Sequence, residues 1–321
     1  MKKSQRQKRR EKYKKPQLTK KEITKKVPQK TFYDKNYKKL IIIPALLLLI
    51  AILLITMKII NTGEFINKGI TLSGGVSVTV IKENINKETL LQDLEQEFPE
   101  YQINIRGIDD SGRRIGVLIE TNLPPENKEE ANKFNELIKQ KTNASNQDIS
   151  TETIGSSLGD AFFKQTLIAV ILAFIFMGAV IFMYFKLVVP SALTILSALS
   201  DIIITLAVVN VLGINIGTAG IAAFLMLIGY SVDANIVLNM RVIKRTTGTI
   251  PEQIKSAFST GLTMSVTTLI AITVAFIIVD SPVLKEIMLI LIIGLIVDVL
   301  NTWIQNAGLL RWYLEKKEQK N

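Results

Sequence analysis

The sequence predicts a polytopic α-helical membrane protein that carries one small α+β domain outside the bilayer. Three observations lead to this fold class. The chain has 321 residues and a positive mean hydropathy of +0.30, although 21% of its residues are charged. Its charged residues are gathered in particular stretches of the chain. Six long apolar segments lie between these stretches, a segregation that is typical of membrane proteins and not of a single soluble domain.

Each of the six apolar segments is long enough to cross a membrane, because a bilayer core of roughly 30 Å needs about 20 apolar residues in a helix. The first segment, residues 40–60, follows the polar residues 1–39 and is expected to be an uncleaved anchor. The other five are clustered within residues 165–310, at 165–185, 187–212, 216–238, 257–279 and 284–310. The predicted layout is therefore a basic tail (1–39), one transmembrane helix (40–60), an external domain (61–164), a five-helix transmembrane domain (165–310) and a short C-terminal tail (311–321).

The distribution of Lys and Arg predicts the orientation in the membrane. Residues 1–39 contain 17 Lys or Arg against 3 acidic residues, and further basic residues follow the fourth and sixth segments. Cytoplasmic loops are enriched in Lys and Arg. We therefore expect both termini in the cytoplasm and the large loop, with 17 acidic and 11 basic residues, outside the cell membrane. The high pI belongs to the tail, which is suited to anionic membrane lipids, and no binding of nucleic acid is expected.

Residues 61–164 have the pattern of a small α+β domain. Alternating apolar residues predict strands at 76–82, 101–108, 113–120 and 148–154, and helical spacing predicts helices at 87–98 and 126–141. Residues 109–112 have the composition of a turn. The resulting order, βαββαβ, is that of a ferredoxin-like domain, a fold that hosts too many functions to identify one.

The chain contains no cysteine and no histidine. Their absence excludes thiol nucleophiles, iron–sulfur clusters, a Ser-His-Asp triad and a His-Glu-x-x-His zinc site. We therefore expect no enzyme, no cofactor and no metal. Any proton chemistry must use carboxylates, Lys, Tyr or water.

Three acidic residues lie well inside the predicted spans, away from their ends, and we take them as proton-coupling candidates: Asp201, Asp233 and Asp298. A charge at the centre of a bilayer costs on the order of 2.5 to 3.5 kcal/mol, so each carboxyl group needs a partner, a proton or water. For Asp201 and Asp298 the alternative is a role in helix packing. For Asp233 the alternative is a structural salt bridge or a cap near a helix break, with Arg241 two turns later.

Three polar stripes are expected to face the interior of the helix bundle, because their members recur at helical spacing. One stripe contains Asp201 and a second contains Asp298. Packing alone is the simpler explanation for the third, which has only hydroxyl side chains. The stripes are Thr194, Ser197, Asp201 and Thr205; Asp298, Asn301, Thr302 and Gln305; and Ser256, Thr260, Thr263 and Thr267.

Three stretches resemble motifs of the SecF family of protein-export membrane proteins, especially its archaeal branch. Residues 69–75 (Gly-Ile-Thr-Leu-Ser-Gly-Gly) are similar to the signature that follows the first span, residues 229–241 to the motif of the fourth span, and residues 298–313 to the C-terminal motif. The resemblance covers residues 40–314. The positions that carry it besides the acids are Gly69, Gly74, Gly75, Gly229, Tyr230, Ser231, Asn235, Arg241, Asn301, Gln305 and Asn306.

The resemblance implies an accessory subunit that acts with SecD and the Sec translocation channel, and that helps exported polypeptides leave the membrane on its outer side. SecD and SecF are similar to the resistance-nodulation-division transporters, whose carboxylates in central spans couple to proton movement. Asp233 matches the motif carboxylate of the fourth span. Ala234 and Asn235 read like the SecD motif, whereas archaeal SecF relatives often have a second acid at position 235. A SecD-like subunit, or half of a proton-coupled small-molecule efflux transporter, therefore remains an alternative.

Overall fold

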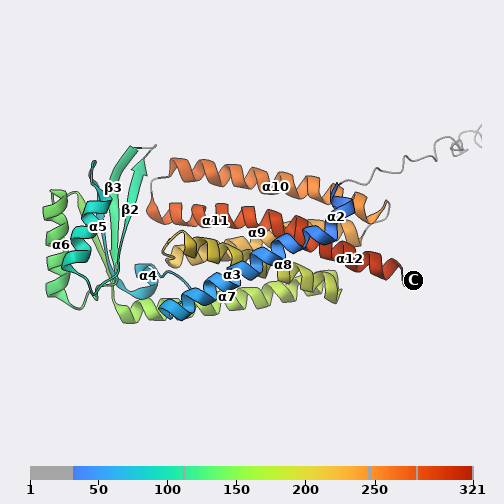
Figure 1. Ribbon diagram of the computed structural model, residues 1–321, viewed down its shortest axis with the longest axis horizontal. Helices are drawn as coiled ribbons and strands as arrows, with labels where there is room; N and C mark the ends of the chain where they lie inside the picture. Colours follow the sequence, from blue (N-terminus) through green and yellow to red (C-terminus); the bar gives the residue numbers. More distant parts are fainter. Residues whose placement is uncertain (1–31, 111–112, 245–247, 280, 320–321) are drawn as a thin grey trace, which may run out of the picture. The chain divides into compact units, whose positions relative to one another are not determined.

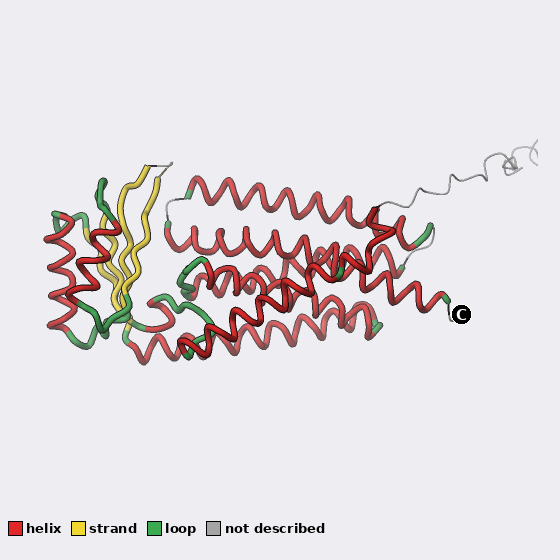
Figure 2. Tube along the Cα trace, viewed as in Figure 1, coloured by secondary structure: helices red, strands yellow, loops and turns green. Residues whose placement is uncertain are grey.

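The computed structural model describes residues 32–110, 113–244, 248–279 and 281–319. Most of the expected basic tail, and Ser111 and Gly112 of the expected turn, lie outside the described residues. Of the first unit of the chain, only the start of helix α2 (Phe32–Leu40) is described. From Lys38 onward the chain forms one compact unit, in which long helices adjoin a small sheet domain (Figures 1 and 2).

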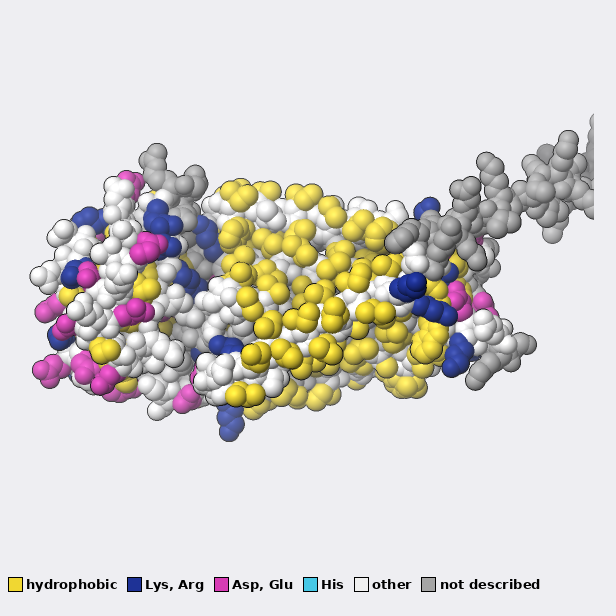
Figure 3. Space-filling view, in the orientation of Figure 1, with side chains coloured by type: hydrophobic (Ala, Val, Ile, Leu, Met, Phe, Trp, Pro, Cys, Tyr) yellow, Lys and Arg dark blue, Asp and Glu magenta, His cyan; other side chains and the backbone are white. Residues whose placement is uncertain are grey.

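Five stretches of the described residues are helical, long and apolar enough to cross a membrane. Many large apolar side chains on these helices are exposed, and Figure 3 shows them as a broad band between two ends that carry the charged side chains. A soluble surface does not carry an apolar band of this extent, so the protein is a multi-pass membrane protein. The helices are α3 (Ile42–Thr62, within the span Asn36–Thr62), α7 (Ser156–Phe185), α8 (Val188–Val211), α9 (Thr218–Ile243) and α10 (Ile250–Ile278).

The sixth expected span, residues 284–310, is not one regular helix. Helix α11 (Pro282–Leu300) continues into a π-helix, η2 (Asn301–Asn306), and then into α12 (Ala307–Glu318). With Lys285, Glu286 and Asp298 in its sequence, this segment is not among the five spans found in the described residues. The C-terminal tail expected from residue 311 is helical as far as Glu318, and its first residue, Arg311, is buried.

The helices differ in how much surface they bury. Half of α8 and half of α9 is buried, and α9 contacts α8, α10 and α11. In contrast, α3 and α7 expose most of their surface. The central helices α8, α9 and α11 therefore form the interior of the bundle, which is where the polar side chains gather.

The sheet domain has the element order that the sequence predicts. Strands β1 (Gly75–Val80), β2 (Ile103–Asp110), β3 (Arg113–Thr121) and β4 (Ile149–Ile154) form an antiparallel sheet in the order β2-β3-β1-β4. Helices α5 (Lys87–Glu97) and α6 (Lys128–Thr142) cover the face that is turned away from the long helices (Figure 1). Asp109 and Asp110, expected in the turn, belong to β2, where the backbone register sets them opposite residues 114 and 113 of β3.

Alternation along the strands explains the layering of this domain. Val76, Val78 and Val80 of β1 point into a core that they share with Leu94 of α5 and Phe134 of α6. The residues between them point to the opposite, polar face of the sheet. Each covering helix begins at an asparagine whose side chain accepts a hydrogen bond from a backbone N–H of the first turn, Asn86 for α5 and Asn127 for α6.

Candidate functional site

A pair of acidic side chains is buried where α8, α9 and α11 meet. Asp201 on α8 is fully buried, and its carboxylate oxygens accept hydrogen bonds from Ser231 at 2.6 Å and from Asn301 at 2.7 Å. Asp298 on α11 is 1% exposed and accepts a hydrogen bond from Thr302 at 3.0 Å. The two carboxyl groups are also in contact with each other. The structure thus brings together two of the three candidate acids.

A chain of amide side chains extends this site along the bundle. Asn235 donates to the carbonyl oxygen of Ser231 at 2.8 Å and accepts from Asn306. One turn further along α9, Asn239 donates to Thr194 at 2.7 Å. Gln305 donates to Ser200 at 3.2 Å. The predicted inward direction of the stripes on α8 and on residues 298–305 is therefore correct, since all of their members are buried.

The buried carboxyl pair has no basic partner among the described residues, because the hydrogen bonds to Asp201 and Asp298 come from the hydroxyls of Ser231 and Thr302 and from the side-chain amide of Asn301. Two carboxylates in contact repel each other and have lost their hydration. A pair of this kind is chemically suited to hold one proton between its two groups. Neither carboxyl alone would have this property.

The π-helix η2 supplies much of the site. Its wider turn directs four of its polar side chains into the bundle, and each of them is at most 5% exposed: Asn301, Thr302, Gln305 and Asn306. Single π turns within α-helices are frequent at functional sites. The many amide side chains in this segment are a sequence signal for the site. Nothing in the sequence indicates the change in helical period.

Asp233 lies outside this site. It is exposed on the surface of α9, and it has no hydrogen-bond or ion-pair partner among the described residues. The helix runs unbroken past it, so a cap at a helix break is excluded. Arg241 does not pair with it either, since the guanidinium donates to the hydroxyl of Ser256 at 2.6 Å and to its carbonyl oxygen at 2.9 Å.

The neighbours of Asp233 on the same face are also uncovered. Tyr230 is 39% exposed, and a side chain at Gly229 would meet no atom within 4 Å. Ser231, one position further round the helix, instead points inward to Asp201. The motif of the fourth span therefore has two faces, one in the buried site and one on the surface.

The hydroxyl stripe of α10 does not face the interior, contrary to the expectation from its spacing. Ser256, Thr263 and Thr267 are exposed, and Thr260 is half-buried. The three threonine hydroxyls donate to backbone carbonyls one turn earlier, as in Thr263 to Ser259 at 2.8 Å, whereas the hydroxyl of Ser256 accepts from Arg241. The buried side of α10 instead follows Ala257, Gly261 and Ser265, because Gly261 leaves room for the ring of Trp303.

The glycines of residues 69–75 join the sheet domain to the helices. Gly74 (φ +75°) and Gly75 (φ +135°) have positive φ angles, and a Cβ at Gly74 would lie 2.5 Å from Cα of Ser156 at the start of α7. The N–H of Gly69 donates to the carbonyl oxygen of Ile216, in the loop before α9, at 2.9 Å. These positions thus serve backbone conformation and close approach.

Two further contacts reach the start of α9, one from α11 and one from the sheet, and neither was predicted from the sequence. Glu286 of α11 accepts a hydrogen bond from the N–H of Gly217 at 2.8 Å, which places a carboxylate at the N-terminus of α9. On the polar face of the sheet, Arg106 pairs with Glu120, and Asn215 of the loop before α9 donates to Glu120 at 3.5 Å. A charged residue at the start of an apolar span was the available signal for Glu286.

In the described part of the sheet domain, three side chains have shifted pKa values. The backbone N–H of Ser145 and then its hydroxyl, at 2.9 and 2.8 Å, lower the pKa of Asp148. A hydrogen bond to Glu130 at 2.6 Å raises the pKa of Tyr101. Lys133 lowers the pKa of Glu97. The interactions of Glu130 and Lys133 tie α6 to the start of β2 and to α5, and the interaction of Asp148 closes the loop between α6 and β4.

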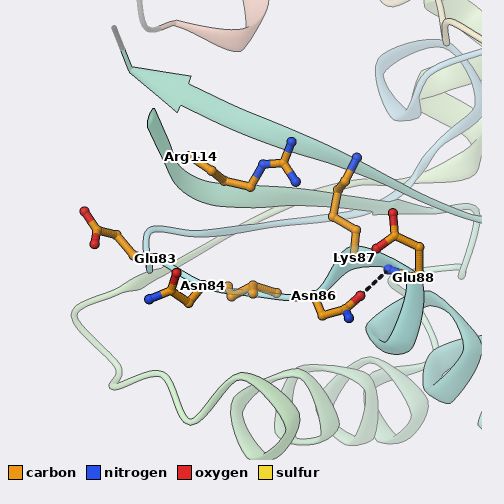
Figure 4. Close-up of a pocket in the computed structure, with 7 residues that line it drawn as sticks. Glu83, Asn84, Asn86, Lys87, Glu88 and Arg114 are labelled. Carbon is orange, nitrogen blue, oxygen red and sulfur yellow. Dashed lines mark hydrogen bonds between the residues drawn. The ribbon is translucent and has the colours of Figure 1, made fainter. Parts of the chain in front are cut away.

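Two of the hollows in the described part of the chain adjoin the sheet domain. One, of about 640 Å³, lies at the loop before α5 and is lined by side chains of both charges, among them Glu83, Lys87 and Arg114 (Figure 4). Asn86 in its wall is already used to cap α5. The other, of about 880 Å³, lies between the sheet domain and the ends of α3 and α8.

Comparison with known proteins identifies the family to which the chain belongs. The model of the family described as protein export membrane protein SecD/SecF, C-terminal, matches residues 133–316, more than half of the chain. A protein-export membrane protein SecF of Methanolacinia petrolearia is 35% identical over 282 residues, which cover 87% of this chain and 94% of the relative. The chain belongs to the SecF family. The predicted resemblance to SecF is thereby confirmed.

Other relatives of the same description match over a shorter region. SecF of Methanocaldococcus jannaschii is 46% identical over 53% of this chain, and SecF of Thermococcus gammatolerans is 47% identical over 52%. These matches span 62% and 53% of the two relatives. The most similar part of the SecF chains is therefore about half of their length.

The fold is also shared with a solved structure. The crystal structure of SecDF, a translocon-associated membrane protein from Thermus thermophilus, has a TM-score of 0.71 at 22% identity and covers 89% of this chain. Only 39% of that SecDF chain is matched. SecDF in a super-membrane-facing form has a TM-score of 0.55 over 92% of this chain. The SecF fold thus corresponds to one part of a longer protein.

Proposed function

We propose that this SecF-family protein is a noncatalytic accessory subunit of the Sec export machinery, which acts with a SecD-like subunit and the translocation channel to promote the translocation and release of exported polypeptides. The family supports the export role, since relatives described as protein-export SecF cover nearly the whole chain. The match of this chain to 39% of a SecDF chain supports a partner that supplies the remainder. The observation that carries the proposal is the outward face around Asp233.

A carboxylate on the lipid-facing surface of a span costs on the order of 2.5 to 3.5 kcal/mol, so a surface that displays one needs a polar partner. Asp233 has none within the described residues. Arg241 reaches from α9 to Ser256 at the start of the α10 hydroxyl stripe, so the two helices together present a polar surface. We assign this surface, with Tyr230 and Asp233 at its centre, to the contact with the SecD-like subunit.

The finer topology is part of this proposal. We place one span before the sheet domain and five after it, with α11 as the sixth span despite its charges, and we classify the domain as ferredoxin-like. Its strand order, β2-β3-β1-β4, supports this class. We place both termini in the cytoplasm of the cell. Because the chain has no cysteine, Thr151→Cys should be labelled from outside intact cells and Lys317→Cys should not; the reverse labelling would overturn the orientation.

We also propose that proton movement contributes to export through two linked positions. The pair Asp201 and Asp298 holds a proton inside the bundle, and Asp233 carries charge at the partner contact. Helix α9 connects the two positions, because Ser231, which donates a hydrogen bond to Asp201, lies two residues before Asp233 on the same helix. One charge moving through 100 mV of membrane potential releases roughly 2.3 kcal/mol, which is sufficient to bias states that differ by a few kcal/mol.

Purification of the tagged chain from gently solubilised membranes tests the assembly. The proposal predicts recovery of a SecD-like subunit and of the translocation channel. Recovery of a second copy of this chain, without Sec components, would instead support half of a small-molecule efflux transporter. Recovery of a further SecF-type chain as the partner would support the SecD-like alternative that the Ala234-Asn235 sequence left open.

Substitution of Asp233 tests the proton step separately. Asp233→Asn keeps the size of the side chain and removes its ionisation, so we expect normal assembly and reduced gradient-dependent export. Asp233→Glu is the matched control and should restore export. Normal export by an assembled Asp233→Asn variant would show that the charge is dispensable.

A further inference from the structure

The cleft of about 880 Å³ lies beside an open edge of the sheet. Its walls come from the end of α3, the linker to β1, the start of β2, the end of β3 and the loop between α8 and α9. Acidic, basic and amide side chains line it, among them Lys58, Glu120, Gln102, Asn104, Asn122 and Asn215. The cleft therefore sits where the sheet domain meets the helices, and it is not an apolar pocket.

Strand β2 is at the edge of the sheet and pairs only with β3 among the described strands. The N–H of Asn122 donates to the carbonyl oxygen of Gln102, so residues 102, 104 and 106 direct their backbone groups toward β3. Ile103 and Ile105, which alternate with them, direct their N–H and C=O groups to the open side. Neither Ile103 nor Ile105 makes a backbone hydrogen bond to a described residue outside the sheet.

Two side chains of the cleft are likewise uncommitted. Gln102 is exposed and Asn104 half-buried, and neither side-chain amide makes a hydrogen bond within the described residues. Each offers one acceptor and two donors. Together with the open edge, they match the hydrogen-bonding groups of an extended polypeptide backbone, which repeat at every second residue.

We propose that this cleft binds an extended segment of an exported polypeptide, which adds to β2 as a further strand paired with Ile103 and Ile105. Strand addition takes most of its affinity from backbone hydrogen bonds and so accepts many sequences, as an export substrate requires. Lining side chains of both charges exclude neither acidic nor basic segments. The inference rests on the export role proposed above and adds the place of contact and its chemistry.

Cysteine crosslinking tests the contact between β2 and the exported polypeptide. Because the chain has no natural cysteine, each introduced cysteine is its only thiol. Asn104 and Glu152 lie in one row across the sheet, through Glu120 and Ser77, at its two opposite edges. Asn104→Cys therefore has a matched control in Glu152→Cys. The substrate is an exported chain that carries one cysteine and is stalled during export by a folded C-terminal domain. We expect this substrate to form a thiol crosslink with Asn104→Cys, and the crosslink yield with Glu152→Cys to be at least about fivefold lower.

Proline at the open edge tests the strand pairing. Ile105→Pro removes a backbone N–H that faces away from β3, so it spares the existing ladder. We expect it to lower the crosslink at position 104 about fivefold, whereas Ile105→Val leaves it unchanged. Unchanged resistance of the sheet domain to an external protease verifies that the proline variant is folded.

Three results would overturn the inference: equal crosslinking at 104 and 152, no effect of the proline in a folded variant, or a crosslink from 104 to a SecD-like subunit in place of the exported chain. In each case, co-purification with Sec components and an export defect on deletion of the gene would leave the proposed function standing. Loss of both would instead overturn the function itself.

Discussion

Gly74 allows the joint between the sheet domain and the helices to be tested quantitatively. Its φ and ψ of +75° and 167° belong to a region that is essentially restricted to glycine, and a Cβ would lie 2.8 Å from the backbone nitrogen of Ser156. Backbone strain of about 1 to 3 kcal/mol and a steric cost of about 1 to 3 kcal/mol add to roughly 2 to 6 kcal/mol for Gly74→Ala. Gly63→Ala is the matched control, because Gly63 has φ +74° but no atom within 4 Å, so only the strain of about 1 to 2 kcal/mol applies.

Pulse proteolysis over a urea series, on the protein in detergent, measures this difference. With a slope of about 1 to 3 kcal/mol per M, Gly74→Ala should lower the urea midpoint for cleavage of the sheet domain by about 1 M or more, and Gly63→Ala by clearly less. Equal shifts in the two variants would refute the steric part of the reasoning. A Gly74→Ala variant that unfolds at the wild-type urea concentration would refute all of it.

Three further predictions concern single contacts. Gly261→Leu should separate α10 from the ring of Trp303 and lower the thermal midpoint in detergent, whereas the exposed Thr263→Leu should not; equal midpoints would mean that this packing is unimportant. Asp201→Leu leaves Ser231 and Asn301 without a buried acceptor and should lower the same midpoint more than Asp201→Asn, and the opposite order would contradict the hydrogen-bond account. Because the pKa of Asp148 is lowered in the folded state, its contribution to stability is fully present above the unfolded pKa of about 3.9 and is lost as the pH falls through the folded pKa. Amide hydrogen exchange of residues 145–148 should therefore be slower in the wild type than in Asp148→Asn at neutral pH, and the two should become alike only in acid. A difference that persists in acid would disprove the assignment.

Much of the fold could be predicted because it follows from residue type and spacing. The apolar segments, the βαββαβ order and the inward direction of Asp201 and Asp298 depend on local periodicity, which the sequence contains. The backbone need at Gly74 and Gly75 was predictable from glycine at the start of a strand.

The remainder depended on neighbours that a single sequence does not display. The stripe of α10 has regular spacing, but the inner side of that helix is decided by Trp303 from a distant segment. The outward direction of Asp233 and the contact of Asp201 with Asp298 likewise depend on tertiary packing. The π-helix at Asn301–Asn306 changes the period locally, which no counting of residues in threes and fours can detect.

The central claim is that the face of α9 around Asp233 meets a SecD-like subunit. Tyr230 lies on this face and is 39% exposed, while Ile175 of α7 is 61% exposed on a helix that buries little surface. A thiol-directed photocrosslinker on Tyr230→Cys in native membranes should capture a SecD-like subunit, and the same reagent on Ile175→Cys should capture only lipid. Capture of a second copy of this chain at position 230, or of no protein, would contradict the account.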